Sequence, residues 1–117
     1  MFSSTYKEQY DTKGYVVIPG LIPDDLLPLL HAASENVISK TRSGKWPHRR
    51  VVGKQFPPYE SDNPDSWGVQ HVMHPDLGED AEVFKKWYTS NRLIEAVKGL
   101  IPCEENELQM GTFELCP

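Results

Sequence analysis

Two histidines and an aspartate near the middle of the chain, His71, His74 and Asp76, have the side-chain types of a metal site. His74 and Asp76 are two residues apart, and two such residues in an extended segment project to the same side. Their His-x-Asp order is that of the two-His-one-carboxylate triad that binds Fe(II) in non-haem oxygenases. However, Pro75 suits a turn, and Asp76 comes just before a predicted helix whose first N–H groups favour a carboxylate. We therefore predict a turn or cap role, with a metal site or a lid residue that touches substrate as the alternatives.

A run of basic residues precedes this region and contains no acidic residue before Glu60. It holds six of the twelve basic residues of the chain: Lys40, Arg42, Lys45, Arg49, Arg50 and Lys54. Such a run can bind an anionic substrate or cosubstrate, for example a carboxylate or a CoA phosphate. Charge runs are more often ordinary solvated loops, and this second interpretation is the one that we favour.

The composition of the chain narrows the classes of function. Its 117 residues carry a net charge of −5, from 12 basic and 17 acidic residues, which argues against a general nucleic-acid-binding protein. No stretch approaches the ~20 apolar residues of a membrane span, and residues 1–6 lack a secretory signal pattern. We therefore predict a cytoplasmic protein with no membrane partner. Cys103 and Cys116 lack the paired spacing of a zinc site, and we expect both thiols to be reduced.

Several segments show the periodicity of helices that could position these side chains. From Asp24 to about Lys40, apolar residues recur at the three-and-four spacing of one helix face: Leu26, Leu30, Ala33 and Val37. Ser43 and Gly44 end this helix. Shorter helices are predicted at residues 80–88 and at 91–101, the latter capped by Ser90 or Asn91 and stopped by Pro102, and a further one within residues 1–13.

Two strands are predicted in addition to the helices. Residues 15–18 are an apolar, largely β-branched run between Gly14 and Pro19-Gly20, which is typical of a short buried strand. Residues 107–115 alternate imperfectly between apolar and polar positions, which also favours a strand. Between residues 41 and 78 prolines interrupt any period, so we expect an irregular lid or a segment that packs on a partner surface. These elements together predict an α+β fold.

Six short stretches carry a resemblance to a known family. They are GYVVIPGL at 14–21, VGKQFPP at 52–58, WGVQH at 67–71, HPDL at 74–77, WY at 87–88 and ELQM at 107–110. This series resembles the N-terminal part of the phytanoyl-CoA dioxygenase family, non-haem iron oxygenases that use 2-oxoglutarate. The resemblance extends from about Tyr6 to Met110, and it covers only the first part of the family's fold.

The resemblance implies a fold, two cofactors and a small-molecule substrate. Residues 1–117 would form a single partial domain, an incomplete double-stranded β-helix (jelly-roll) fragment with N-terminal helices and a few strands. The family's own His-x-Asp pair follows a strand similar to residues 107–110, so the iron-binding half lies outside this chain, which should bind neither Fe(II) nor 2-oxoglutarate alone. Lys54 and Met110 are candidate cofactor contacts in a complete homologue, with a surface lysine and a core methionine as the ordinary alternatives.

Three functional hypotheses follow. The first is the N-terminal portion of a phytanoyl-CoA dioxygenase-like oxygenase, inactive by itself. The second is a non-catalytic binding module that docks on a partner chain through unpaired strands and through the aromatic residues of segment 41–78. The third is a small metal protein built on His71, His74 and Asp76.

Overall fold

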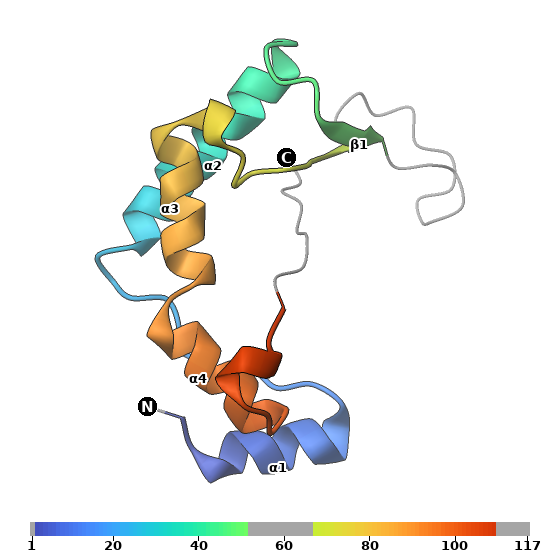
Figure 1. The fold of residues 1–117 in the computed structure, drawn as a ribbon, viewed down its shortest axis with the longest axis vertical. Helices are drawn as coiled ribbons and strands as arrows, with labels where there is room; N and C mark the ends of the chain where they lie inside the picture. Colours follow the sequence, from blue (N-terminus) through green and yellow to red (C-terminus); the bar gives the residue numbers. More distant parts are fainter. Residues whose placement is uncertain (1, 52–66, 110–117) are drawn as a thin grey trace.

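The protein combines helices with one small antiparallel sheet, which makes it an α+β structure (Figure 1). The computed structural model describes residues 2–51 and 67–109. Within them the chain forms α1 (Ser4–Lys13), α2 (Leu27–Arg42), β1 (Arg49–Val51), β2 (Trp67–Val69), the 3₁₀ turn η1 (Pro75–Leu77), α3 (Glu79–Tyr88), α4 (Asn91–Leu100) and the 3₁₀ turn η2 (Glu105–Glu107). All four predicted helices are therefore present, with boundaries that differ by a few residues.

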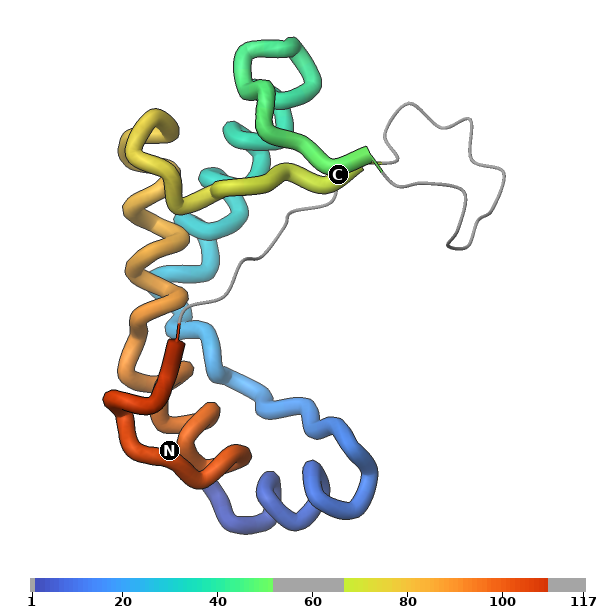
Figure 2. The backbone as a smooth tube through the Cα atoms, turned by 45° about the vertical axis from the view of Figure 1, so that its right-hand side comes forward, coloured from blue at the N-terminus to red at the C-terminus, as the bar shows by residue number. Residues whose placement is uncertain are grey.

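Helices α2 and α3 lie side by side and enclose the main hydrophobic core (Figures 1 and 2). The core consists of nine buried side chains from α2, α3, β2 and the loops beside them: Ala33, Val37, Trp46, Trp67, Val69, Val72, Leu77, Ala81 and Phe84. The predicted inward face of α2 is confirmed, because Ala33 and Val37 are 1% and 0% exposed. At the rim, the Asn36 side-chain amide donates a hydrogen bond to the Asp80 carboxylate at 3.2 Å.

Helix α2 begins three residues later than its periodicity indicates. The amides of Leu26 and Leu27 both bond to the carbonyl of Pro23, which forms a tight turn ahead of the helix. The next helical hydrogen bond would run from residue 28 to the carbonyl of Asp24, but Pro28 has no N–H to donate. The regular helix therefore starts only at Leu27. The predicted end of the helix is confirmed, since Ser43 is its C-cap and Gly44 follows with φ of 82°, a conformation suited to glycine.

Helix α4 forms a second, smaller unit with α1 at the opposite end of the molecule (Figure 1). The predicted cap is confirmed, because the Ser90 hydroxyl accepts a hydrogen bond from the amide of Leu93. Ala96 is the buried residue of α4, and α1 has no buried side chain. This unit is therefore held by much less apolar burial than the α2–α3 core.

The sheet differs from the predicted one in both of its strands. β1 and β2 pair antiparallel, with Arg49 opposite Val69 and Val51 opposite Trp67. All of β2 is buried against the core and all of β1 is exposed. Both strands lie in segment 41–78, where no strand was predicted, because three residues are too short to show an alternating pattern.

The strand predicted at residues 15–18 is wrong, and most of the strand predicted at residues 107–115 lies outside the described residues. Residues 15–18 join no strand, and the side chains of Tyr15 and Val17 are 64% and 74% exposed. An apolar, β-branched run becomes a strand only where a neighbouring strand accepts its backbone hydrogen bonds, and no strand of the described ranges pairs with residues 15–18. In the second segment Glu107 ends η2, residues 108–109 have no regular structure, and the remainder lies outside the described residues.

The protein has an open, elongated shape (Figure 2). Its Cα radius of gyration is 16.6 Å, whereas a compact domain of this length has one of about 13 Å. Four further large apolar side chains besides Tyr15 and Val17 are exposed: Leu27, Leu29, Val51 and Ile101. The helices thus leave a substantial apolar surface open to solvent.

Candidate functional site

Trp46 lies among the residues of this protein whose side chains could take part in chemistry. Its ring is 5% exposed, and its indole Nε1 donates a hydrogen bond to the carbonyl of Gln70 at 3.1 Å. This bond ties the turn after α2 to the residues after β2. The amide of Gln70 in turn donates to the carbonyl of His48 at 2.9 Å, which extends the β1–β2 pairing by one step. The segments on either side of the sheet are therefore held against each other.

Three imidazole rings gather around Trp46 as a consequence. The His48 ring centroid lies 5.0 Å from that of Trp46 and 5.2 Å from that of His71. The His74 centroid lies 5.7 Å from Trp46 and 6.3 Å from His48. All three histidines are exposed on their outer side, while Trp46 closes the inner side. We call His48, His71 and His74 the histidine cluster.

The two histidines that the sequence singled out lie in a tight turn together with Asp76. His74 is the N-cap of η1, and its Nδ1 accepts a hydrogen bond from the amide of Asp76 at 3.0 Å. The carboxylate Oδ2 of Asp76 lies 3.7 Å from the same nitrogen. The amide of His74 bonds to the carbonyl of His71, whose φ of 59° is left-handed. This is the capped turn that the sequence predicts.

His48 is the member of the cluster that sequence reasoning missed. It is separated from His71 by the whole of segment 49–70, and no motif joins the two. The strand pairing that brings them together was itself not predicted. The available signal was the sequence Trp46-Pro47-His48, in which an aromatic residue and a histidine follow the helix end. As the side chains stand, no three His, Cys, Asp or Glu residues in the described ranges converge on one point.

Two residues of the basic run have structural positions at the end of α2. Arg42 lies above the ring of Trp67, with its guanidinium carbon 5.9 Å from the ring centroid, and so covers the core. Lys40 and Arg42 occupy the last turn of α2, where cations interact favourably with the helix dipole. These placements fit an ordinary structural role. Lys54 and Met110, the two candidate cofactor contacts, lie outside the described residues.

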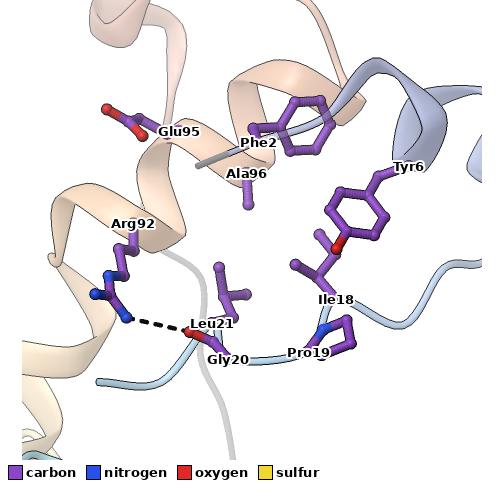
Figure 3. Close-up of a pocket in the computed structure, with 9 residues that line it drawn as sticks. All are labelled: Phe2, Tyr6, Ile18, Pro19, Gly20, Leu21, Arg92, Glu95 and Ala96. Carbon is purple, nitrogen blue, oxygen red and sulfur yellow. Dashed lines mark hydrogen bonds between the residues drawn. The ribbon is translucent and has the colours of Figure 1, made fainter. Parts of the chain in front are cut away.

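A pocket of about 290 Å³ lies where α1, the segment before α2 and α4 meet (Figure 3). It is lined by nine residues: Phe2, Tyr6, Ile18, Pro19, Gly20, Leu21, Arg92, Glu95 and Ala96. The Arg92 guanidinium donates a hydrogen bond to the carbonyl of Gly20 at 3.1 Å, so this cation holds the linker against α4. Arg92 and Glu95 are the two charged residues of this lining, and the hydrogen bond of Arg92 is the structural one to Gly20.

No protein-family model, curated protein or solved structure matches this chain. None of the helices in the described ranges combines the length and apolar content needed to cross a bilayer. Function must therefore be argued from the residues themselves.

Proposed function

We propose that this chain is the N-terminal portion of a phytanoyl-CoA dioxygenase-like, Fe(II)- and 2-oxoglutarate-dependent oxygenase, and that it has no oxygenase activity alone. The six short stretches quoted above support this assignment. Four of them lie in described parts that form the linker before α2, strand β2, turn η1 and the end of α3. In this proposal they build a helical layer that packs against a jelly roll formed by other residues. The protein is cytoplasmic and its substrate is a small molecule.

The observation that carries the proposal is the exposed apolar surface of an open helical layer. Leu27 and Leu29 lie on the outer side of α2 with 41% and 49% of their surface exposed. Val17 precedes them on the linker and is 74% exposed. Single exposed apolar residues are normal, but several on neighbouring segments are typical of a surface that another element covers. A β-barrel half would supply such a cover.

The residues present do not fit the iron site of that family. A facial triad needs His74 and Asp76 to direct their side chains at one ion. Instead the Asp76 amide donates to Nδ1 of His74, and the Asp76 side chain is 78% exposed. The pair therefore serves as a turn cap. We derive no oxygenase step from the described residues, and the proposal places the iron ligands in other segments.

The proposal predicts that the chain does not assemble an Fe(II)–2-oxoglutarate complex. Purified protein should be mixed without oxygen with one equivalent of Fe(II) and excess 2-oxoglutarate, and its visible spectrum recorded. We expect no metal-to-ligand charge-transfer band, because no carboxylate-containing triad is formed by the described residues. A band that saturates at one equivalent of iron would contradict the claim of inactivity. Reading the coding sequence after Pro117 for a His-x-Asp pair and a distant histidine tests the family assignment itself.

A second candidate function is a non-catalytic module that docks on a partner chain. It is favoured by strand β1, where Val51 is 64% exposed and, among the described residues, β2 is the one strand that pairs with it. This function predicts that the purified chain self-associates or binds a β-rich partner through that strand. Sedimentation velocity at increasing protein concentration measures this directly. A single monomeric species at every concentration would argue against docking between copies of the chain.

A further inference from the structure

We propose that the pocket between α1, α4 and the segment before α2 binds a small monocarboxylic acid with an apolar body, such as an arylacetate. In this proposal the apolar body lies against the inner wall of the pocket, and the carboxylate pairs with the guanidinium of Arg92 at its rim. The pocket volume of about 290 Å³ is close to the lower end of the range of about 300–1,000 Å³ for ligand pockets, so its ligand is a small molecule. The proposal is independent of the oxygenase assignment, because it uses no metal.

The inner wall of the pocket is apolar and largely shielded from solvent. Ala96 of α4 is 4% exposed, and the side chains of Phe2, Ile18 and Leu21 are half-buried. Figure 3 shows these four side chains around one common space. Alanine keeps this space open where a longer side chain of α4 would fill it. A ligand therefore gains free energy by placing apolar surface there, out of contact with water.

Phe2 is held in this wall by close packing on Gly99 of α4. A Cβ atom on Gly99 would overlap the Phe2 ring, so the ring occupies the space that the glycine leaves free. The same ring packs against Tyr6 of α1, with the two centroids 5.9 Å apart and the planes tilted by 53°. Glycine is unfavourable inside a helix relative to alanine, and the contact with Phe2 gives a reason for it at this position.

Arg92 supplies a positive charge at the rim of the pocket. Its guanidinium donates a hydrogen bond to the carbonyl of Gly20 at 3.1 Å, and Gly20 is its one hydrogen-bond partner among the described residues. A guanidinium has five N–H donors, so the others are available to a carboxylate, which arginine binds through paired hydrogen bonds. The bond to Gly20 already restrains the side chain, which reduces the conformational entropy that ligand binding would cost.

The two other polar side chains of the lining favour an anion over a cation. The hydroxyl of Tyr6 faces the pocket beside Ile18 (Figure 3), and within the described ranges it has no hydrogen-bond partner. A phenolic O–H can donate a further hydrogen bond to a bound carboxylate. Glu95 is exposed, and in Figure 3 its carboxylate points away from the space between the apolar side chains. The donors thus lie around the space and the acidic group is turned outward.

The experiment titrates the full chain with phenylacetate and follows the backbone amide resonances by NMR. We expect saturable binding with a dissociation constant of about 1 mM or tighter, an ordinary affinity for a ligand of about ten non-hydrogen atoms. The largest shifts should occur at Phe2, Tyr6 and Ala96. Phenylacetamide keeps the ring without the charge, and acetate keeps the charge without the ring. Each should bind at least about tenfold more weakly than phenylacetate.

Three variants test the residues that carry the proposal. Arg92→Gln should weaken phenylacetate binding at least about fivefold, because the charged donor is lost. Lys98→Gln is the matched control, since it removes the same charge from the same helix at a residue that does not line the pocket, and its affinity should stay within about twofold. Gly99→Ala displaces the Phe2 ring and should weaken binding at least about fivefold, with helix content retained because alanine favours a helix.

The comparison of the three compounds on the unchanged chain needs no substitution, so it tests the proposal even if Arg92→Gln releases the segment before α2. The proposal is overturned if phenylacetate does not saturate, or if phenylacetamide binds as tightly. It is also overturned if Lys98→Gln and Arg92→Gln weaken binding equally while the far-UV circular dichroism of both is native. The charge-transfer measurement with Fe(II) and 2-oxoglutarate does not involve this pocket, so either proposal can fail without the other.

Discussion

Replacing Trp46 by alanine should lower the free energy of unfolding by about 3–5 kcal/mol, the usual loss for a large buried aromatic ring. The ring is 5% exposed and belongs to the main core, so its removal leaves a cavity between the end of α2 and the segment after β2. The indole hydrogen bond to Gln70 is lost as well. Small domains have a total stability of about 5–15 kcal/mol, so a large share disappears with one side chain.

Two variants separate the contributions of the ring and of its hydrogen bond. Trp46→Phe keeps most of the apolar volume and loses the N–H donor, so its effect should be smaller than that of Trp46→Ala by at least about 1 kcal/mol. Val51→Ala shortens an exposed apolar side chain and should change stability by less than about 0.5 kcal/mol. Urea unfolding followed by far-UV circular dichroism measures all three. Equal losses for Trp46→Ala and Val51→Ala would show that Trp46 does not support the core.

The helices could be predicted from the sequence because their signals are local. The inward face of α2 follows from the spacing of Ala33 and Val37, and both are buried as expected. Ser90 is recognisable as a cap because a hydroxyl before an apolar run can accept a helix N–H. The start of α2 was predicted too early, because the spacing of apolar residues carries no information on the missing N–H of Pro28.

The strands could not be predicted because strand formation depends on partners distant in the sequence. Residues 15–18 have the composition of a strand and no neighbour, whereas Arg49–Val51 has a polar composition and pairs with Trp67–Val69. Short strands are thus selected by what lies beside them more than by their own propensity. The same cause hid the histidine cluster, since His48 meets His71 only through that pairing.

In the candidate site too, features of adjacent residues could be predicted from the sequence and contacts between distant residues could not. The turn around His74 and Asp76 was predicted, because Pro75 and a following helix are features of adjacent residues. The sequence indicates a direct metal ligand or a cap, and the structure shows the cap: the amide of Asp76 donates to Nδ1 of His74, and the carboxylate Oδ2 lies 3.7 Å from that nitrogen.

Replacing Ala33 by leucine should destabilise the protein by about 1–3 kcal/mol through overpacking. Ala33 is 1% exposed and lies in the core between α2 and α3, where Ala81 is 0% exposed. Small buried residues on two packed helices allow the helices to approach closely, and three added carbons have little free volume to occupy in a close-packed core. The larger side chain must therefore push α3 away or adopt a strained rotamer.

The neighbouring residue provides the matched control for this substitution. Ala32 is exposed on the outer side of the same helix, so Ala32→Leu makes the same chemical change without a packing partner. Leucine and alanine have similar helix propensities, and we expect a change within about 0.5 kcal/mol. Thermal and urea unfolding of the two variants gives the difference directly. If Ala33→Leu is as stable as Ala32→Leu, α2 and α3 are not in close contact at this position. The core between the two helices would then have to be packed more loosely around Ala33.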